Sequence, residues 1–196
     1  DWAIAGPFTH SGGGGMGRLP TAGIGWYRKQ LDIPTGDAGK SIFLDVDGAM
    51  SYATVWLNGQ IVGGWPFGYA SWRVDLTPYV KTGAANELVI RLDDPPNSSR
   101  WYPGAGIYRN VWLTKTSPVH VAQWGTSVTT PEVSATSATV TVSADIANHA
   151  ASPASLRVAT QLFKADSTGQ PVGRALVSSD PEPLALPAGE TKPVVS

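Results

Sequence analysis

The sequence contains no cysteine and few charged residues, and both shortages exclude classes of function. Without cysteine the chain forms no disulfide and has neither a thiolate nucleophile nor a cysteine-ligated zinc site. Charged residues make up only 15% of the chain, with 14 Lys and Arg against 15 Asp and Glu, which gives a formal charge of −1. Because no basic stripe is available to neutralise phosphates, nucleic acid is excluded as a partner.

Long apolar segments are also missing. No apolar run approaches the roughly 20 residues that a membrane-spanning helix needs, so we expect no membrane partner. The 42% of hydrophobic residues in a chain of 196 residues is nevertheless enough for the cores of one large or two small domains.

Tryptophan and tyrosine are absent after Trp124. Seven of the eight Trp and all six Tyr lie before residue 113. Such a difference in composition predicts two domains with differently built cores, at 1–117 and 118–196, which are joined near Ser117.

Short apolar and polar alternations predict an all-β fold in both domains. No helical period is sustained beyond one turn at 76–80, and the glycine-rich residues 1–25 are expected to form a loop. Asn58 and Gly59 predict a two-residue hairpin turn of type I′. Strands are predicted around 26–29, 42–46, 53–57, 61–62, 72–75, 88–92 and 107–113, and in the second domain around 119–121, 140–146 and 156–162.

The second domain is predicted to be an immunoglobulin-like β-sandwich. Such sandwiches typically need about 100 residues and seven strands, and only about 78 residues remain here. The pattern therefore predicts an incomplete immunoglobulin-like β-sandwich at 118–196.

An elaborate connection joins the strand that ends at Asp93 to the strand predicted from Ile107. Pro95 and Pro96 stiffen its entry because each fixes φ and removes an amide donor. The residues that follow offer hydroxyl, amide and guanidinium groups together with two aromatic faces, which are the groups that recognise a polyol. This loop is the predicted sugar-binding site, and its candidate residues are Asn97, Ser99, Arg100, Trp101 and Tyr102.

The same loop carries a family resemblance. The segment RWYPGAGIYRNV at 100–111, GWYRK at 25–29 and VWLNG at 55–59 resemble the N-terminal domain of glycoside hydrolase family 2, the β-galactosidase, β-glucuronidase and β-mannosidase group. The opening DWAI at 1–4 resembles the family's entry segment. The resemblance extends over residues 1–118 and implies that the first domain is a jelly-roll (galactose-binding-like) sandwich.

The family resemblance also implies that substrate binding and catalysis are divided between domains. In this family the jelly roll is followed by an immunoglobulin-like module and then by a (β/α)₈ barrel that supplies both catalytic glutamates. The motif loop leans over the barrel mouth and helps to hold the terminal sugar. The expected partners are therefore a β-glycoside, with a β-galactoside favoured, and the missing barrel. No cofactor or metal is implied. A homo-oligomer of the parent enzyme is left open.

The residues themselves give no catalytic pair. Glycoside hydrolysis usually needs two carboxylates about 5 to 9.5 Å apart, and the adjacent Asp93 and Asp94 should point to opposite faces of a strand. The histidines His10, His120 and His149 are scattered without metal or triad spacing. No catalytic residue is therefore assigned within this chain.

Other interpretations stay open at this point. The chain is alternatively a free-standing carbohydrate-binding module or a structural, adhesive pair of β-sandwiches. Within the loop, Trp101 and Tyr102 alternatively cap the sandwich core while Arg100 is solvated. Arg109, on the same predicted face as Ile107, either pairs with a carboxylate at the sandwich rim or points back to the loop.

Overall fold

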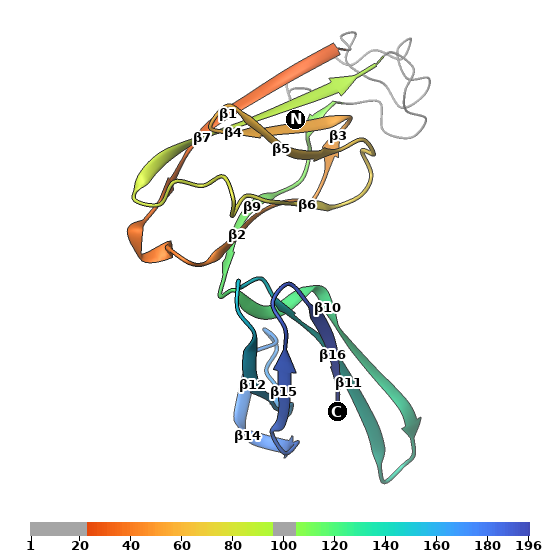
Figure 1. Cartoon of the computed structure of the whole chain (residues 1–196). Coiled ribbons are helices and arrows are strands. Elements are labelled where there is room, and N and C mark those ends of the chain that lie inside the picture. Colours follow the sequence, from red (N-terminus) through yellow and green to blue (C-terminus); the bar gives the residue numbers. More distant parts are fainter. Residues whose placement is uncertain (1–22, 96–104) are drawn as a thin grey trace, which may run out of the picture. The chain divides into compact units, whose positions relative to one another are not determined.

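The computed structural model describes residues 23–95 and 105–196, and its regular structure is β apart from one short 3₁₀ helix, η3 (Thr35–Asp37) (Figure 1). The all-β prediction is confirmed. The chain divides into two compact units, Asp1–Thr116 and Ser117–Ser196. Within the described ranges no helix is long and apolar enough to cross a membrane.

The first unit contains two larger antiparallel sheets and one short ladder. In the first sheet β7 lies between β1 and β4, and β5 forms the edge next to β4; in the second, β2 lies between β6 and β9. The short ladder joins β3 and β8. The strands are β1 (Gly23–Ile33), β2 (Ser41–Val46), β3 (Ala49–Met50), β4 (Ala53–Leu57), β5 (Gln60–Trp65), β6 (Trp72–Asp75), β7 (Ala84–Asp94), β8 (Gly106–Ile107) and β9 (Val111–Thr116).

The core of this unit lies between the two larger sheets. Alternate residues of β4 and β7 are buried, as the pattern predicted, because successive side chains of a strand point to opposite faces. Strand β2 differs from the predicted alternation of buried and exposed residues, because the Phe43 side chain is buried as well as those of Ile42 and Leu44. The guanidinium of Arg73 lies 4.5 Å from the Phe43 ring centroid, so a cation covers this ring on the outward side.

The Asn58-Gly59 turn is confirmed. Both residues have positive φ, 52° and 81°, and the flanking Leu57 and Gln60 are paired. The Asn58 amide also donates to Asn86 Oδ1 at 2.9 Å and to the Tyr79 carbonyl at 3.1 Å. The buried Asn86 side chain in turn bonds the backbone of Lys81 and Ala84. This asparagine network ties the hairpin turn to the segment that precedes β7.

Two predicted boundaries in the first unit are wrong. The strand predicted from Ile107 is interrupted, because the backbone amides of Tyr108 and Arg109 both point to the Gly48 carbonyl, at 3.2 and 3.3 Å. Arg109 is therefore exposed instead of facing the core, and it makes no ion pair among the described residues. At the N-terminal side, β1 begins at Gly23, inside the range predicted to be a loop.

The second unit contains strands β10 to β16. They form one three-stranded sheet and two strand pairs, which are β10-β11-β16, β12-β15 and β13-β14. The strand predicted at 156–162 is divided at Thr160, whose amide bonds Ser179 Oγ while its carbonyl accepts from the Ser179 amide, so the chain changes partner there. The bounds are β10 (Val119–Val133), β11 (Ala138–Asn148), β12 (Ala154–Val158), β13 (Gln161–Ala165), β14 (Pro171–Ser178), β15 (Glu182–Leu186) and β16 (Thr191–Val195).

The core of the second unit is small. Its fully buried apolar side chains are Ile146, Ala147 and Leu186, in keeping with a segment that contains no Trp or Tyr after Trp124. The buried Asn148 amide donates to the carbonyls of Leu186 and Pro187, both at 3.1 Å, and so joins β11 to the end of β15. The incompleteness of the immunoglobulin-like sandwich stays a prediction.

Replacing Asn86 by alanine should destabilise the first unit. The side chain is 0% exposed and serves Lys81, Ala84 and Asn58, so its loss leaves buried polar groups without partners. We expect the free energy of unfolding to fall by about 3 kcal/mol, measured by urea denaturation. The exposed Asn110→Ala is the matched control and should change it by less than about 0.5 kcal/mol. Equal effects of the two variants would contradict the structural role of the network.

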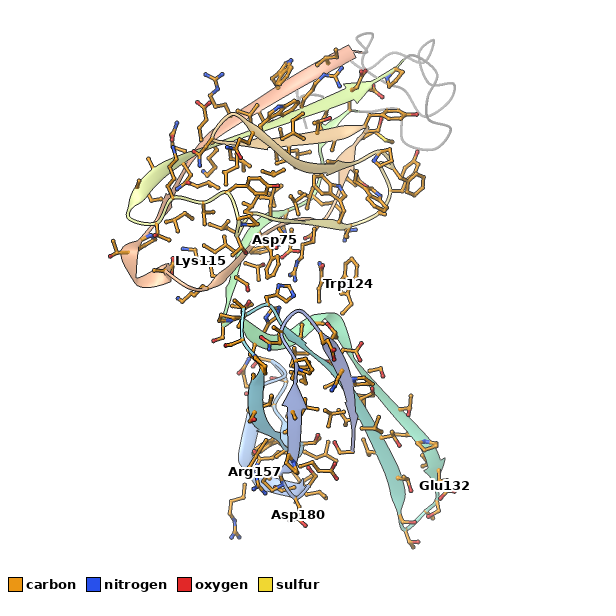
Figure 2. The ribbon with its side chains drawn as sticks, in the orientation of Figure 1. Asp75, Lys115, Trp124, Glu132, Arg157 and Asp180 are labelled. Atoms are coloured by element: carbon orange, nitrogen blue, oxygen red, sulfur yellow. The ribbon has the colours of Figure 1, made fainter. Side chains whose placement is uncertain are left out.

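A second prediction concerns Asp37, at the end of η3. It accepts hydrogen bonds from Lys115 Nζ of β9 (Figure 2) and from Lys40 Nζ at 2.8 Å, and these bonds hold the pKa of its carboxyl below the ordinary value of 3.8. A depressed pKa in the folded state stabilises the protein above pH 3.8, and this contribution is lost as the pH falls through the folded-state pKa. Asp37→Asn should therefore lower the urea midpoint at pH 7, and the difference from the wild type should shrink as the pH falls below 3.8, whereas the exposed Asp32→Asn should leave the midpoint unchanged at every pH.

Candidate functional site

The five predicted sugar-binding residues, Asn97, Ser99, Arg100, Trp101 and Tyr102, lie outside the described residues. The structure does describe both ends of their loop. At the entry, β7 runs to the buried Asp94, and at the exit the chain returns with the buried Ala105 and enters β8. We call the segment between β7 and β8, residues 95–105, the motif loop.

Both ends of the motif loop are fixed to the sandwich. At the entry, Asp93 donates its amide to the Ser51 carbonyl at 2.9 Å, and its carbonyl accepts from Ser51 Oγ at 2.8 Å. At the exit, Gly106 and Ile107 pair with β3, and the Ile107 amide donates to Tyr27 Oη at 3.2 Å. The loop therefore starts and ends on rigid strands, which is the arrangement that positions a binding loop.

Exposed aromatic side chains surround these ends. Tyr52, Phe67 and Tyr69, which we call the aromatic rim, are all largely exposed, and the Phe67 and Tyr69 rings meet edge to face with centroids 5.5 Å apart. The rim adjoins the motif loop because Tyr52 follows Ser51 directly and because Tyr108 Oη donates to the Gly68 carbonyl at 2.7 Å. Sequence reasoning missed these residues, although the signal was present as the run WPFGY between two predicted strands.

Two glycines allow the rim to pack this closely. A Cβ on Gly48 would lie 2.6 Å from Tyr108 Cζ, and one on Gly68 would lie 2.1 Å from Met50 Sδ. Both distances are shorter than any stable contact, so only glycine fits without movement of the neighbour. The close packing also explains why burial raises the pKa of the Tyr108 hydroxyl above its ordinary value of 10.0.

The carboxylates at the loop entry face opposite sides of β7, as predicted. Asp94 is 3% exposed on the inward side, whereas Asp93 lies on the outward side and pairs with Arg91 at 2.7 Å. They do not face a common substrate. A further carboxylate, Asp45 on β2, is bound by both Nε and Nη2 of Arg73, at 2.6 and 2.9 Å, and by the Thr114 hydroxyl, which marks it as a structural ion pair.

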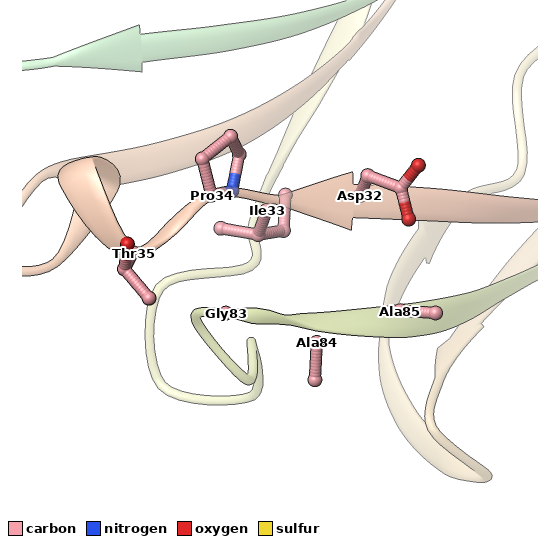
Figure 3. A pocket seen from close by; sticks show the side chains of 7 residues that line it. All are labelled: Asp32, Ile33, Pro34, Thr35, Gly83, Ala84 and Ala85. Atoms are coloured by element: carbon pink, nitrogen blue, oxygen red, sulfur yellow. The ribbon is translucent and has the colours of Figure 1, made fainter.

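Two hollows occur elsewhere in the described part of the first unit. One of about 410 Å³ lies where β1 ends and β7 begins, opposite to the motif loop, and small side chains of residues 32–35 and 83–85 line it (Figure 3). The other, of about 290 Å³, is lined by the apolar Leu88, Ile90, Ile107 and Val111 and by Tyr27, Arg28 and Lys29. No described aromatic residue lines the first hollow.

The histidines are less scattered than predicted. The rings of His120 and His149 meet edge to face with centroids 5.0 Å apart in the second unit. Within the described ranges, no three His, Asp or Glu side chains come together as a metal site would require.

Comparisons with known proteins agree on one family. Residues 25–105 match the family model described as "Glycosyl hydrolase 2 galactose-binding domain-like". A protein of Bacteroides ovatus named "Beta-galactosidase BoGH2A" is 42% identical over 186 residues, which is 93% of this chain and 21% of that protein. The chain thus spans about a fifth of the length of the curated relatives that it matches first.

Solved structures show the same relationship. The crystal structure of a glycosyl hydrolase family 2 member from Bacteroides cellulosilyticus superposes with a TM-score of 0.84 and 31% identity, covering 99% of this chain and 25% of that one. A β-glucuronidase of Bacteroides uniformis gives a TM-score of 0.77 at 31% identity, covering 90% of this chain and 21% of that one.

The bond between Tyr108 and Gly68 leads to a prediction. Tyr108→Phe removes it and should cost about 1 kcal/mol of stability, with faster hydrogen exchange at the Tyr52 amide, which donates to the Pro66 carbonyl. The raised pKa of Tyr108 stabilises the fold below pH 10.0, and this contribution is lost at higher pH. The stability of the variant should therefore fall less above pH 10.0 than that of the wild type. Tyr52→Phe, at an exposed ring, serves as control, and identical results for both variants would refute the anchoring role of Tyr108.

Proposed function

Because the chain belongs to glycoside hydrolase family 2, we propose that it is a non-catalytic region of a β-glycosidase and that its motif loop forms part of the substrate pocket. The observation that carries this proposal is the 42% identity over 93% of the chain with a β-galactosidase. The chain corresponds to 21% of that relative, and the catalytic domain is proposed to lie in the remainder of the parent protein. Residues 1–117 form the jelly-roll domain in this proposal and 118–196 the immunoglobulin-like domain.

The motif loop supplies one wall of the pocket. Asn97, Ser99 and Arg100 bond hydroxyl groups of the terminal sugar, and Trp101 and Tyr102 offer flat apolar surfaces to its C–H faces. The support for this assignment lies at the two ends of the loop, which are fixed to β3 and to Tyr27. Because rigid strands hold the ends of the loop, the loop orients the sugar with little loss of conformational entropy on binding.

The hydrolytic step itself uses carboxylates outside this chain. Cleavage of a glycosidic bond needs an acid that protonates the leaving oxygen and a second carboxylate that acts as nucleophile or base. The two carboxylates at the loop entry do not fit these roles, because Asp93 is bound to Arg91 and Asp94 lies on the opposite face. In this proposal the (β/α)₈ barrel provides both groups, and the chain described here contributes substrate binding.

The proposed substrate is a β-galactoside. The relative that is 42% identical is named a β-galactosidase, whereas relatives named β-glucuronidases are 28% to 34% identical.

Replacing Arg100 by alanine in the parent enzyme tests the pocket assignment. If the guanidinium bonds a sugar hydroxyl, its loss leaves that hydroxyl without a partner in a largely dry site, which typically costs about 1 to 3 kcal/mol, or roughly 5- to 150-fold in kcat/KM on an aryl β-galactoside. Steady-state kinetics measures this ratio, and an unchanged melting temperature establishes that the fold survives.

Arg174→Ala, at an exposed position of β14, is the matched control and should leave kcat/KM unchanged. Trp101→Ala should weaken catalysis by a similar factor. If Arg100→Ala stays within about twofold of the wild type, a change of only about 0.4 kcal/mol, the motif loop does not contact the substrate. Turnover of an aryl β-galactoside by the chain alone would contradict the assignment of catalysis to the barrel.

A further inference from the structure

The outward face of the β1-β7-β4-β5 sheet carries two tryptophans that the core does not use. Trp26 on β1 and Trp56 on β4 lie on either side of β7, as Figure 1 shows for their strands, and their rings meet above it with centroids 5.4 Å apart and planes tilted by 35°. Trp26 is 61% exposed. We call this surface the tryptophan face.

Paired charges lie beside these rings on the same face. Arg28 contacts Glu87 at 3.5 Å, and Arg91 contacts Asp93 at 2.7 Å. The register places Arg91 directly opposite Trp26, so one ion pair borders the exposed indole. The two cations and two anions beside the rings cancel, so the groups next to the tryptophans offer hydrogen bonds without net charge.

This combination favours one chemical class of ligand. The core of a protein interface is depleted of charged residues, and covering Arg28, whose side chain is 72% exposed, with protein would require its desolvation. A sugar ring instead presents a C–H face to an indole and hydroxyl groups to neighbouring carboxylates and guanidinium groups at the same time. The balance of charges beside the rings gives no attraction for a polyanion and favours an uncharged glycan.

We propose that the tryptophan face binds a neutral glycan chain, with a sugar ring stacked on Trp26 and hydroxyl groups bonded to the Arg91–Asp93 and Arg28–Glu87 pairs. The site lies on the strands of the sheet and not on the motif loop. Glycan binding at this face needs no other domain of the parent protein, so this proposal is tested separately from the pocket proposed above. The strands supply a flat and rigid platform, which suits an extended polymer better than a single sugar.

Electrophoresis of the chain through native gels that contain a polysaccharide tests this proposal. Soluble galactan and hydroxyethyl cellulose are the neutral probes, and polygalacturonate is the charged one. We expect at least one neutral glycan to retard the chain and polygalacturonate not to do so. Trp26→Ala should weaken the association with the neutral glycan about tenfold.

Trp112→Ala is the matched control, because Trp112 is also largely exposed but lies on β9, where its Nε1 donates to Asp47 Oδ2 at 2.9 Å. It should be retarded like the wild type. Arg28→Ala, at a position that makes no core contact, should weaken retardation about threefold and serves as a second test should Trp26→Ala not fold.

Four results would overturn the proposal. The first is the absence of retardation in both neutral glycans, and the second is equal retardation of Trp26→Ala and Trp112→Ala. The third is self-association in sedimentation velocity that Trp26→Ala abolishes, since the occupant of the face would then be a second copy of the chain. Stronger retardation in polygalacturonate than in the neutral glycans would contradict the assignment to uncharged polymers.

Discussion

The antiparallel ladder between β1 and β7 is the interaction on which the first unit depends. Its register is unbroken over 11 residues, from Gly23 opposite Asp94 to Ile33 opposite Ala84. The inward residues of β7, such as Leu88 and Leu92, build the core against the second sheet, and the outward residues build the tryptophan face. A slip of one residue would exchange the two faces, so the core, the outer surface and the start of the motif loop are all set by one register.

Local packing around Ser51 and Tyr108 connects the core to the loop ends. Each bond involved is an ordinary hydrogen bond between 2.7 and 2.9 Å, but together they fix the entry of the loop and the aromatic rim to strands that cannot move without opening the core. Substitutions at Gly48 or Gly68 would act on the rim through steric contact with Tyr108 or Met50 rather than through any contact with a ligand. The position of the proposed pocket wall therefore depends on residues that would not contact the substrate.

Local patterns predicted the elements that local physics determines. The alternation in β4 and β7 and the Asn-Gly turn were found because burial and positive φ are read directly from neighbouring residues. The break after Ile107 was missed because the apolar alternation continues to Val111, while the bonds to Gly48 that interrupt the strand come from a distant segment. For the same reason the sequence did not reveal the tryptophan pair, whose members meet only because β1 and β4 both pair with β7. The five residues assigned to the sugar pocket rest on sequence and family alone.

Asp93 links the two proposed binding surfaces. Its backbone amide and carbonyl hold Ser51 at the entry of the motif loop, while its carboxylate holds Arg91 beside Trp26 on the tryptophan face. A glycan that draws the Arg91 guanidinium toward its own hydroxyl groups changes the forces on the Asp93 carboxylate, and the backbone of the same residue positions the loop. Asp93 therefore contributes to both proposed surfaces, through its backbone at the loop entry and through its carboxylate on the sheet.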